Sequence, residues 1–161
     1  VLARYNHEAN AGMAAVLDKL SEAELSVDRK SYYKSLLGLY SHIAGGELFM
    51  LKNIRAALPG QASLASPVLD AEMRPGKPAF VDYASCKAAL DALDAALIGL
   101  SESLSDDELD AMADVHGRKQ SVAKSLASAI VHAAHHRGEV AQILDEMGVE
   151  NDFFMAGVSG C

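Results

Sequence analysis

The chain has 161 residues, of which half are hydrophobic and 22% are charged, and this fits one globular domain spanning residues 1–161. Its net charge is −8 and it shows no basic patch, which argues against nucleic acids or anionic membranes as partners, because phosphate contacts need clustered Lys or Arg. No segment approaches the roughly 18 apolar residues of a membrane span, and the first residues do not resemble a signal peptide.

Helical periodicity dominates the first half of the chain. A helix is predicted over about 2–20, and the segment 21–24 has the pattern of a capping box that starts a short turn. A second helix is predicted over about 28–58, where apolar residues recur at helical spacing until Pro59-Gly60 ends it.

A long connection over 60–79, rich in Ala, Ser, Pro and Gly, separates the second helix from a third. Its roughly 20 residues can span up to about 65 Å when extended, whereas the preceding helix would be about 45 Å long. The connection can therefore run back along a whole helix, which allows the second and third helices to lie parallel.

The second half of the chain is also predicted to be helical. A third helix is expected over about 81–103, and a second capping-box pattern at 105–108 starts a short helix that ends near 116. A fourth long helix is expected over about 118–147, with Gly148 as its C-cap. No long alternation of apolar and polar residues and no Asn-Gly or Asp-Gly hairpin turn indicates a strand, so the chain is predicted to be all-α.

The last segment, 149–161, carries apolar side chains that we expect to pack onto the body of the domain or onto a partner. The two cysteines, Cys86 and Cys161, lie far apart and have no metal-type spacing. We interpret them as unpaired thiols in a reducing cytosol, which predicts a cytoplasmic protein.

His132 and His136 give the strongest local signal. They lie four residues apart on the flank of the fourth helix's apolar stripe, so both rings leave one face and can converge on one ion. Neutral imidazole is a good ligand for zinc, nickel, iron or copper. Such pairs are also common on exposed helices without a metal, so the pair alone leaves both interpretations open.

A third histidine, His42, lies midway along the predicted second helix. Gly45 and Gly46 follow one turn later and remove side chains where another helix or a ligand could approach. On the fourth helix, Gly138 costs about 1 kcal/mol relative to Ala, which suggests a packing or access reason. Three histidines from two helices would leave a coordination position open, which is typical of a catalytic metal site that lowers the pKa of bound water.

Other metal sites fit the sequence less well. A ferritin-like di-iron bundle needs Glu-x-x-His pairs, and the chain has none. A zincin needs His-Glu-x-x-His, but Ala133 stands where the Glu should be. A haem held by two histidines would leave the 132/136 pair unexplained.

At these residues the sequence resembles the DinB/YfiT-like family. His-Ala-Ala-His-His-Arg-Gly-Glu-Val at 132–140 is similar to a family signature that usually reads His-x-x-His-His-Arg-Gly-Gln. Leu-Tyr-Ser-His-Ile-Ala-Gly-Gly-Glu at 39–47 resembles the family's second-helix motif, and Arg-Tyr-Asn-His-Glu-Ala-Asn at 4–10 looks like its first helix. The resemblance covers nearly the whole chain. It departs at His7, where Trp is common, and at Glu139, where Gln is usual.

The resemblance implies a four-helix bundle with up-down-down-up topology and a long crossover between helices two and three. It also implies one divalent metal ion held by His42, His132 and His136, with zinc or nickel ahead of iron. Characterised members of the family are S-transferases or isomerases that depend on low-molecular-weight thiols, and others are known as DNA-damage-inducible or metal-dependent proteins, often dimeric. A thiol co-substrate and a homodimer are therefore implied for this chain.

Several residues near the motifs have two interpretations. His135 points about 100° away from His136, so we expect it at the surface or supporting a ligand. Arg137 could clamp an anion, although an ion pair between helices or subunits is favoured. Glu47 and Glu139 could act as a general base or hold a ligand histidine in its tautomer, and the alternative for each is a solvated face.

Four further polar residues are assigned to structure. Asn6 and Asn10 share a face of the first helix, and we expect them to form hydrogen bonds with the core. His7 is interpreted as structural and His116 as a helix end.

The sequence leaves two functions open. The first is an enzyme in which a metal-activated thiol or water drives group transfer or hydrolysis on a small-molecule substrate. The second is a non-catalytic metal-binding stress-response protein. An open coordination position beside a pocket favours the enzyme, whereas a site closed by Glu47, Glu139 or another protein ligand favours the second.

Overall fold

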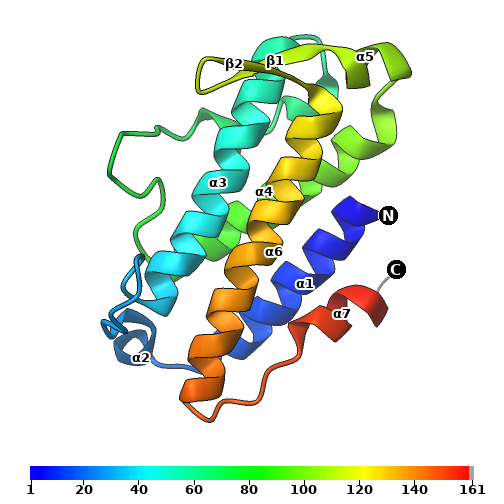
Figure 1. The fold of residues 1–161 in the computed structure, drawn as a ribbon. Coiled ribbons are helices and arrows are strands. Elements are labelled where there is room, and N and C mark those ends of the chain that lie inside the picture. The colour runs from blue at the N-terminus through cyan, green and yellow to red at the C-terminus, as the bar shows by residue number, and fades with distance from the viewer. Residues whose placement is uncertain (160–161) are drawn as a thin grey trace.

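Four long helices form the body of the protein in the computed structural model, which describes residues 1–159 (Figure 1). They are α1 (Leu2–Leu17), α3 (Leu36–Ala57), α4 (Tyr83–Ser103) and α6 (Val122–Glu146). Both α1 and α3 contact α4 and α6, so the four helices enclose a shared core. In the view of Figure 1, α1 and α6 run downward, while α3 and α4 run upward.

Apolar side chains at helical spacing fill the space between these helices. They form two clusters, one of which includes Met13, Leu17, Leu36, Tyr40 and Leu144, and the other Leu51, Ile54, Leu97, Leu100 and Val122. Each of these side chains is at most 1% exposed. Burying a side chain of this size stabilises the fold by roughly 1.5–3 kcal/mol, so the predicted stripes account for the packing of the helices.

Side-chain caps set where the helices begin. Ser35, Asp82 and Ser121 each accept a hydrogen bond from the backbone N–H three residues further on, at the starts of α3, α4 and α6. Both predicted capping boxes are confirmed, and they start the short helices α2 (Glu22–Ser26) and α5 (Asp106–Asp110).

The segment before α3 is a turn and not part of the predicted helix over 28–58. Asp28 accepts a hydrogen bond from the backbone N–H of Lys30 at 2.8 Å, and Lys30 and Lys34 have φ values of 59° and 68°. Left-handed residues cannot continue a right-handed helix, so α3 begins only at Leu36.

A small β-hairpin corrects the prediction that the chain is all-α. β1 (Met112–Val115) and β2 (Arg118–Ser121) pair in antiparallel orientation. His116 and Gly117 form the two-residue turn between them, with φ values of 54° and 75°, and the Gly117 N–H donates to Asp114 Oδ1 at 2.8 Å. Positive φ at both turn residues is the type I′ geometry that Asn-Gly or Asp-Gly usually signals. The interpretation of His116 as a helix end was therefore wrong.

The long connection between α3 and α4 runs back along α3 (Figure 1). It contains two 3-10 turns, η1 (Ala62–Leu64) and η2 (Pro67–Asp70). The guanidinium of Arg55 on α3 donates to the backbone carbonyl of Leu69 at 2.7 Å, which ties the connection to the helix that it follows.

The apolar tail packs onto the body of the domain, which was one of the two predicted arrangements. α7 (Phe153–Ser159) lies against α1, where the rings of Tyr5 and Phe154 meet edge to face at 6.2 Å, and Phe153 is buried. Cys161 lies outside the described residues. None of the helices within residues 1–159 combines the length and hydropathy needed to cross a membrane.

Cys86 is a buried free thiol whose chemistry can be tested directly. Burial raises its pKa to about 11, against an ordinary value of 9.0. In a Cys161→Ser variant we expect Cys86 to react with a thiol reagent at pH 8 about 100-fold more slowly in the folded protein than in urea, because reactivity follows the thiolate fraction. Equal rates in the two conditions would show that the thiol is accessible and unshifted.

Candidate metal centre

The Nε2 atoms of three histidines meet between α3 and α6. The Nε2 atom of His42 on α3 lies 2.9 Å from that of His132 and 3.1 Å from that of His136, both on α6. The spacing of four residues on α6 puts both rings on the side that faces α3. The structure therefore brings together the three residues that the sequence singled out.

The geometry of the three rings suits a metal ion. In a tetrahedral zinc site with Zn–N bonds of about 2.0–2.1 Å, the ligand nitrogens lie about 3.3 Å apart, close to the separations seen here. Without an ion, the N–H of one ring can point at only one of its two neighbours, which leaves lone pairs facing each other. One divalent cation between the three Nε2 atoms removes this conflict.

The rings of His42 and His132 favour the neutral form that binds metals. Burial, together with the nearby His132 and His136, lowers the pKa of His42 to about 4. Burial lowers the pKa of His132 as well, with His136 and His135 as additional causes. Neutral imidazoles offer their lone pairs without first releasing a proton.

Two neighbours fix the position of the rings. A Cβ atom on Gly46 would lie 2.2 Å from Cε1 of His132, so the ring occupies space that only glycine leaves. Tyr33 stacks on His42, with ring centroids 3.9 Å apart and 21° between the planes, and it meets His136 edge-on at 5.3 Å. Gly46 was expected to allow a close approach. Tyr33 was missed, because its segment was predicted to be helical.

Glu139 supports the cluster from behind His136. Its Oε2 atom lies 2.8 Å from Nδ1 of His136, and its Oε1 atom lies 3.5 Å from Nε2 of His135. A carboxylate at Nδ1 keeps the proton there and leaves Nε2 free as a ligand. Because it sits on the opposite edge of the ring, Glu139 does not close the cluster. His135 lies at the surface, with its side chain 67% exposed.

A second polar cluster is buried between the four long helices. Asp94 on α4 accepts hydrogen bonds from Nδ2 of Asn6 at 2.9 Å and of Asn10 at 3.0 Å, both on α1. Arg137 on α6 donates to Oδ1 of the same two asparagines at 2.8 and 2.6 Å. Nδ2 of Asn6 also reaches the carboxyl group of Glu47 on α3 at 3.4 Å.

This cluster decides several open assignments. The core hydrogen bonds predicted for Asn6 and Asn10 are confirmed. Arg137 joins α6 to α1 through hydrogen bonds to these asparagines and not through the ion pair that was favoured. Glu47 was given a solvated face or a role beside the metal, but it is 1% exposed and belongs to the buried cluster. Burial raises its pKa well above the usual range. His7 lies 3.6 Å from Asp94, in keeping with a structural role.

A cleft of about 1090 Å³ lies against the histidine cluster. His42, His132, Gly45 and Gly46 form part of its wall, whereas His136 does not line it. Its size is at the upper end of small-molecule sites, which measure roughly 300–1,000 Å³. Two of the three histidines, His42 and His132, thus border a space that a small molecule can enter.

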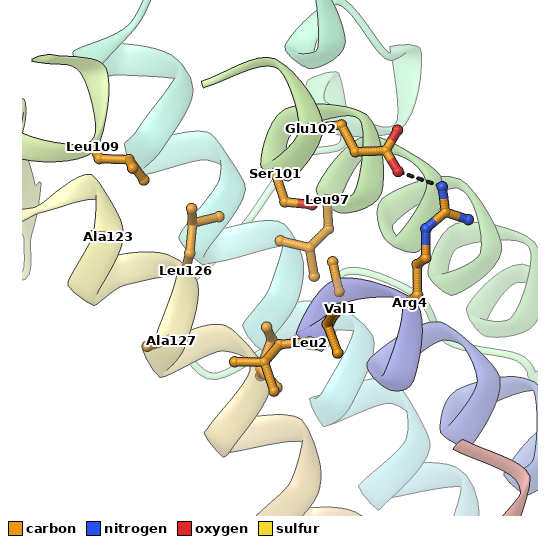
Figure 2. A pocket seen from close by; sticks show the side chains of 12 residues that line it. Val1, Leu2, Arg4, Leu97, Ser101, Glu102, Leu109, Ala123, Leu126 and Ala127 are labelled. Atoms are coloured by element: carbon orange, nitrogen blue, oxygen red, sulfur yellow. Dashed lines mark hydrogen bonds and ion pairs between the residues drawn. The ribbon is translucent and has the colours of Figure 1, made fainter. Parts of the chain in front are cut away.

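A second cavity, of about 430 Å³, lies where the start of α1 meets α4 and α6 (Figure 2). Its wall is mostly apolar and includes Leu2, Leu97 and Leu126, while Arg4 and Glu102 pair on one side. None of the described residues that line it is a histidine or a cysteine. This cavity therefore lacks the imidazole ligands that border the first cleft.

Two comparisons with known proteins agree with the helical fold described above. A model of the DinB family matches residues 1–156. A solved structure of a DinB-like protein from Bacillus cereus ATCC 10987 is similar, with a TM-score of 0.54 and 19% sequence identity over 89% of each chain. At that identity the likeness concerns the fold alone. No curated protein matches the chain.

Proposed function

The chain belongs to the DinB family, and on that premise we propose that it is a metal-dependent transferase or hydrolase acting on a small molecule. One divalent transition-metal ion is held by His42, His132 and His136. The observation that carries the proposal is the convergence of three Nε2 atoms beside a cleft. Those of His132 and His136 lie 2.9 and 3.1 Å from that of His42, and His42 and His132 line the cleft.

The residues of the chain have distinct tasks in this proposal. When bound, the metal ion lowers the pKa of a thiol or water that it holds and so supplies a nucleophile. Glu139 keeps the proton of His136 on Nδ1, so that its Nε2 atom remains a ligand. Tyr33 holds the plane of the His42 ring by stacking on it.

An enzyme is favoured over a non-catalytic metal-binding stress-response protein by the position of the two candidate closing ligands. Glu47 lies in the buried polar cluster, and Glu139 faces the Nδ1 edge of His136. Neither carboxylate reaches the side of the cluster that borders the cleft. This supports a coordination position left free for a substrate.

We extend the proposal to the cofactor and the assembly. Three neutral imidazoles accept zinc, nickel or iron, and we place zinc and nickel first. A low-molecular-weight thiol as co-substrate and a cytoplasmic homodimer complete the proposal. The parallel directions of α3 and α4 and the connection along α3 support an up-down-down-up bundle (Figure 1).

Removing two ligands tests the metal site. In a His132→Ala/His136→Ala variant we expect metal content to fall from about one ion per chain to a trace, since one imidazole cannot hold the ion. Elemental analysis of the purified protein measures this. The matched control is His135→Ala, which removes an exposed neighbour on the same helix and should retain the metal. Unchanged metal in the folded double variant contradicts the proposal.

A further inference from the structure

The cleft beside the histidine cluster carries positive charge although the chain as a whole is acidic. The chain has 22 Asp and Glu residues against 14 Lys and Arg residues. Among the described residues that line the cleft there is no Asp or Glu, whereas Lys34 and Lys77 both line it. The local charge is therefore opposite in sign to the net charge of −8.

The two cleft lysines are free to meet a ligand. Both are exposed, and neither lies within 4.0 Å of a carboxylate among the residues that the structure describes. Lys87, by contrast, pairs with Asp18 at 2.6 Å on another face. A lysine without a partner beside a cavity is a candidate for binding an anion from solution.

Backbone hydrogen bonds fix the positions from which the two lysine side chains extend. The N–H of Lys34 donates to the carbonyl of Ser31, and the N–H of Lys77 donates to the carbonyl of Arg74. Each lysine thus ends a tight turn, one before α3 and one in the connection after it. The first residues of α3 also line the cleft, and the start of a helix adds partial positive charge.

Much of the remaining wall of the cleft is apolar. Phe49, Met50, Met73 and Phe80 line it, and the ring of His116 stacks on Phe49 at 4.5 Å. Methionine side chains adapt to ligands of irregular shape. A ligand that fills this wall needs an apolar portion in addition to its charged group.

We infer that the cleft takes an anionic small molecule with an apolar body, whose anionic group is held by Lys34 and Lys77 and whose reacting end lies at His42 and His132. The placement of the reacting end rests on the proposed function. The charge and the apolar wall that select the ligand do not.

Two probes of equal size test the inference. 4-Mercaptobenzoate and 4-mercaptobenzamide carry the same thiol, and their far ends have similar size but differ in charge and in the N–H donors of the amide. For the full chain as purified, calorimetry should show the benzoate binding about tenfold more tightly, since two exposed charge contacts contribute modestly. The preference should shrink as salt is raised from low ionic strength to about 1 M, where screening acts within roughly 3 Å.

Lysine variants test whether Lys34 and Lys77 cause the preference for the benzoate. In Lys34→Gln/Lys77→Gln the benzoate should lose about tenfold in affinity and the benzamide should be unaffected, because only the charged contacts are gone. Lys19→Gln/Lys124→Gln is the matched control, since it changes the net charge equally with exposed lysines that do not line the cleft. It should retain the preference.

The outcomes separate this inference from the proposed function. Equal affinities for the two probes, no binding of the benzoate at millimolar concentration, or a preference that survives Lys34→Gln/Lys77→Gln would each overturn the inference, even if the histidines hold a metal. A preference that depends on the two lysines in a protein that binds no metal would support the inference while overturning the proposed function.

Discussion

Replacing Gly46 with Ala is expected to abolish metal binding while α3 stays intact. The new Cβ atom would lie 2.2 Å from Cε1, 2.6 Å from Nδ1 and 3.1 Å from Nε2 of His132. Contacts below 3.0 Å do not occur for a Cβ, so the His132 ring must leave its place. We expect zinc affinity to fall by at least 100-fold, since even removing a group that only orients a ligand costs about 10- to 100-fold. Competition with a chromophoric chelator measures it.

Gly45→Ala is the matched control one residue away. A Cβ atom at Gly45 has nothing within 4 Å. Because Ala stabilises a helix interior by up to about 1 kcal/mol relative to Gly, this variant should keep its metal and unfold at a slightly higher temperature. If Gly46→Ala binds zinc as the unchanged protein does, the His132 ring is not where the structure places it.

Sequence reasoning reached the histidine cluster because its signals are local. The pair His132 and His136 has the spacing of one helix turn, and Gly46 lies one turn after His42. The glycine on α6, Gly138, was less informative about the packing of the helices. Gly138 was expected to have a packing or access reason, and packing is excluded because a Cβ atom there would meet nothing within 4 Å. Gly46 and Gly138 cannot be distinguished by sequence, because the difference between them is whether a residue of another helix lies close by.

Asp94 was missed although one signal was available. It lies between Leu93 and Leu97 on the apolar stripe of α4, where an acidic residue is out of place. Its burial depends on Asn6 and Asn10, more than 80 residues away in the chain. Partners on other helices cannot be deduced from the periodicity of one helix, so the buried polar cluster appears only in three dimensions.

The elements that were predicted correctly are those set by short-range hydrogen bonds. The two capping boxes depend on contacts three residues apart. The turn before α3 and the hairpin were missed because Lys30, Lys34 and His116 adopt a left-handed conformation that their residue types seldom take. Contacts such as the stacking of Tyr33 on His42 hold the turn in place.

Asp94→Asn is expected to destabilise the protein by about 1–3 kcal/mol, the cost of leaving a buried polar group without its hydrogen-bond partner. Arg137 only donates and an ionised Asp94 only accepts, so the amides of Asn6 and Asn10 have one permitted orientation between them. An amide oxygen in the place of Oδ1 can still accept from both asparagines, but the NH₂ group in the place of Oδ2 then faces the NH₂ group of Asn10. Flipping the asparagines moves the same conflict to Arg137. Urea unfolding of the metal-free protein at pH 7 measures the loss without a contribution from bound metal.

Glu47→Gln is the matched substitution in the same cluster, and it should cost no more than about 1 kcal/mol. Burial first, and then the charge of Asp94, raise the pKa of Glu47 well above 4.5, and burial also raises the pKa of Asp94. Because Asp94 accepts from both asparagines whereas Glu47 accepts from one, we expect Glu47 to hold the proton, and Gln then reproduces its shape and polarity. The sign of the pH effect follows. Native Glu47 binds its proton more tightly than the unfolded chain, so its contribution is complete below pH 4.5 and is lost as the pH rises toward the raised pKa.

The Gln variant should therefore gain on the unchanged protein as the pH rises above 4.5, by up to about 1.4 kcal/mol per pH unit within that window. A difference in unfolding free energy that stays flat from pH 4 to 8 would mean that Glu47 is ionised in the fold. Asp94→Asn should then be the milder substitution of the two, because a second buried carboxylate would remain to balance Arg137. The order of the two variants and the slope with pH thus report independently on which carboxyl group holds the proton.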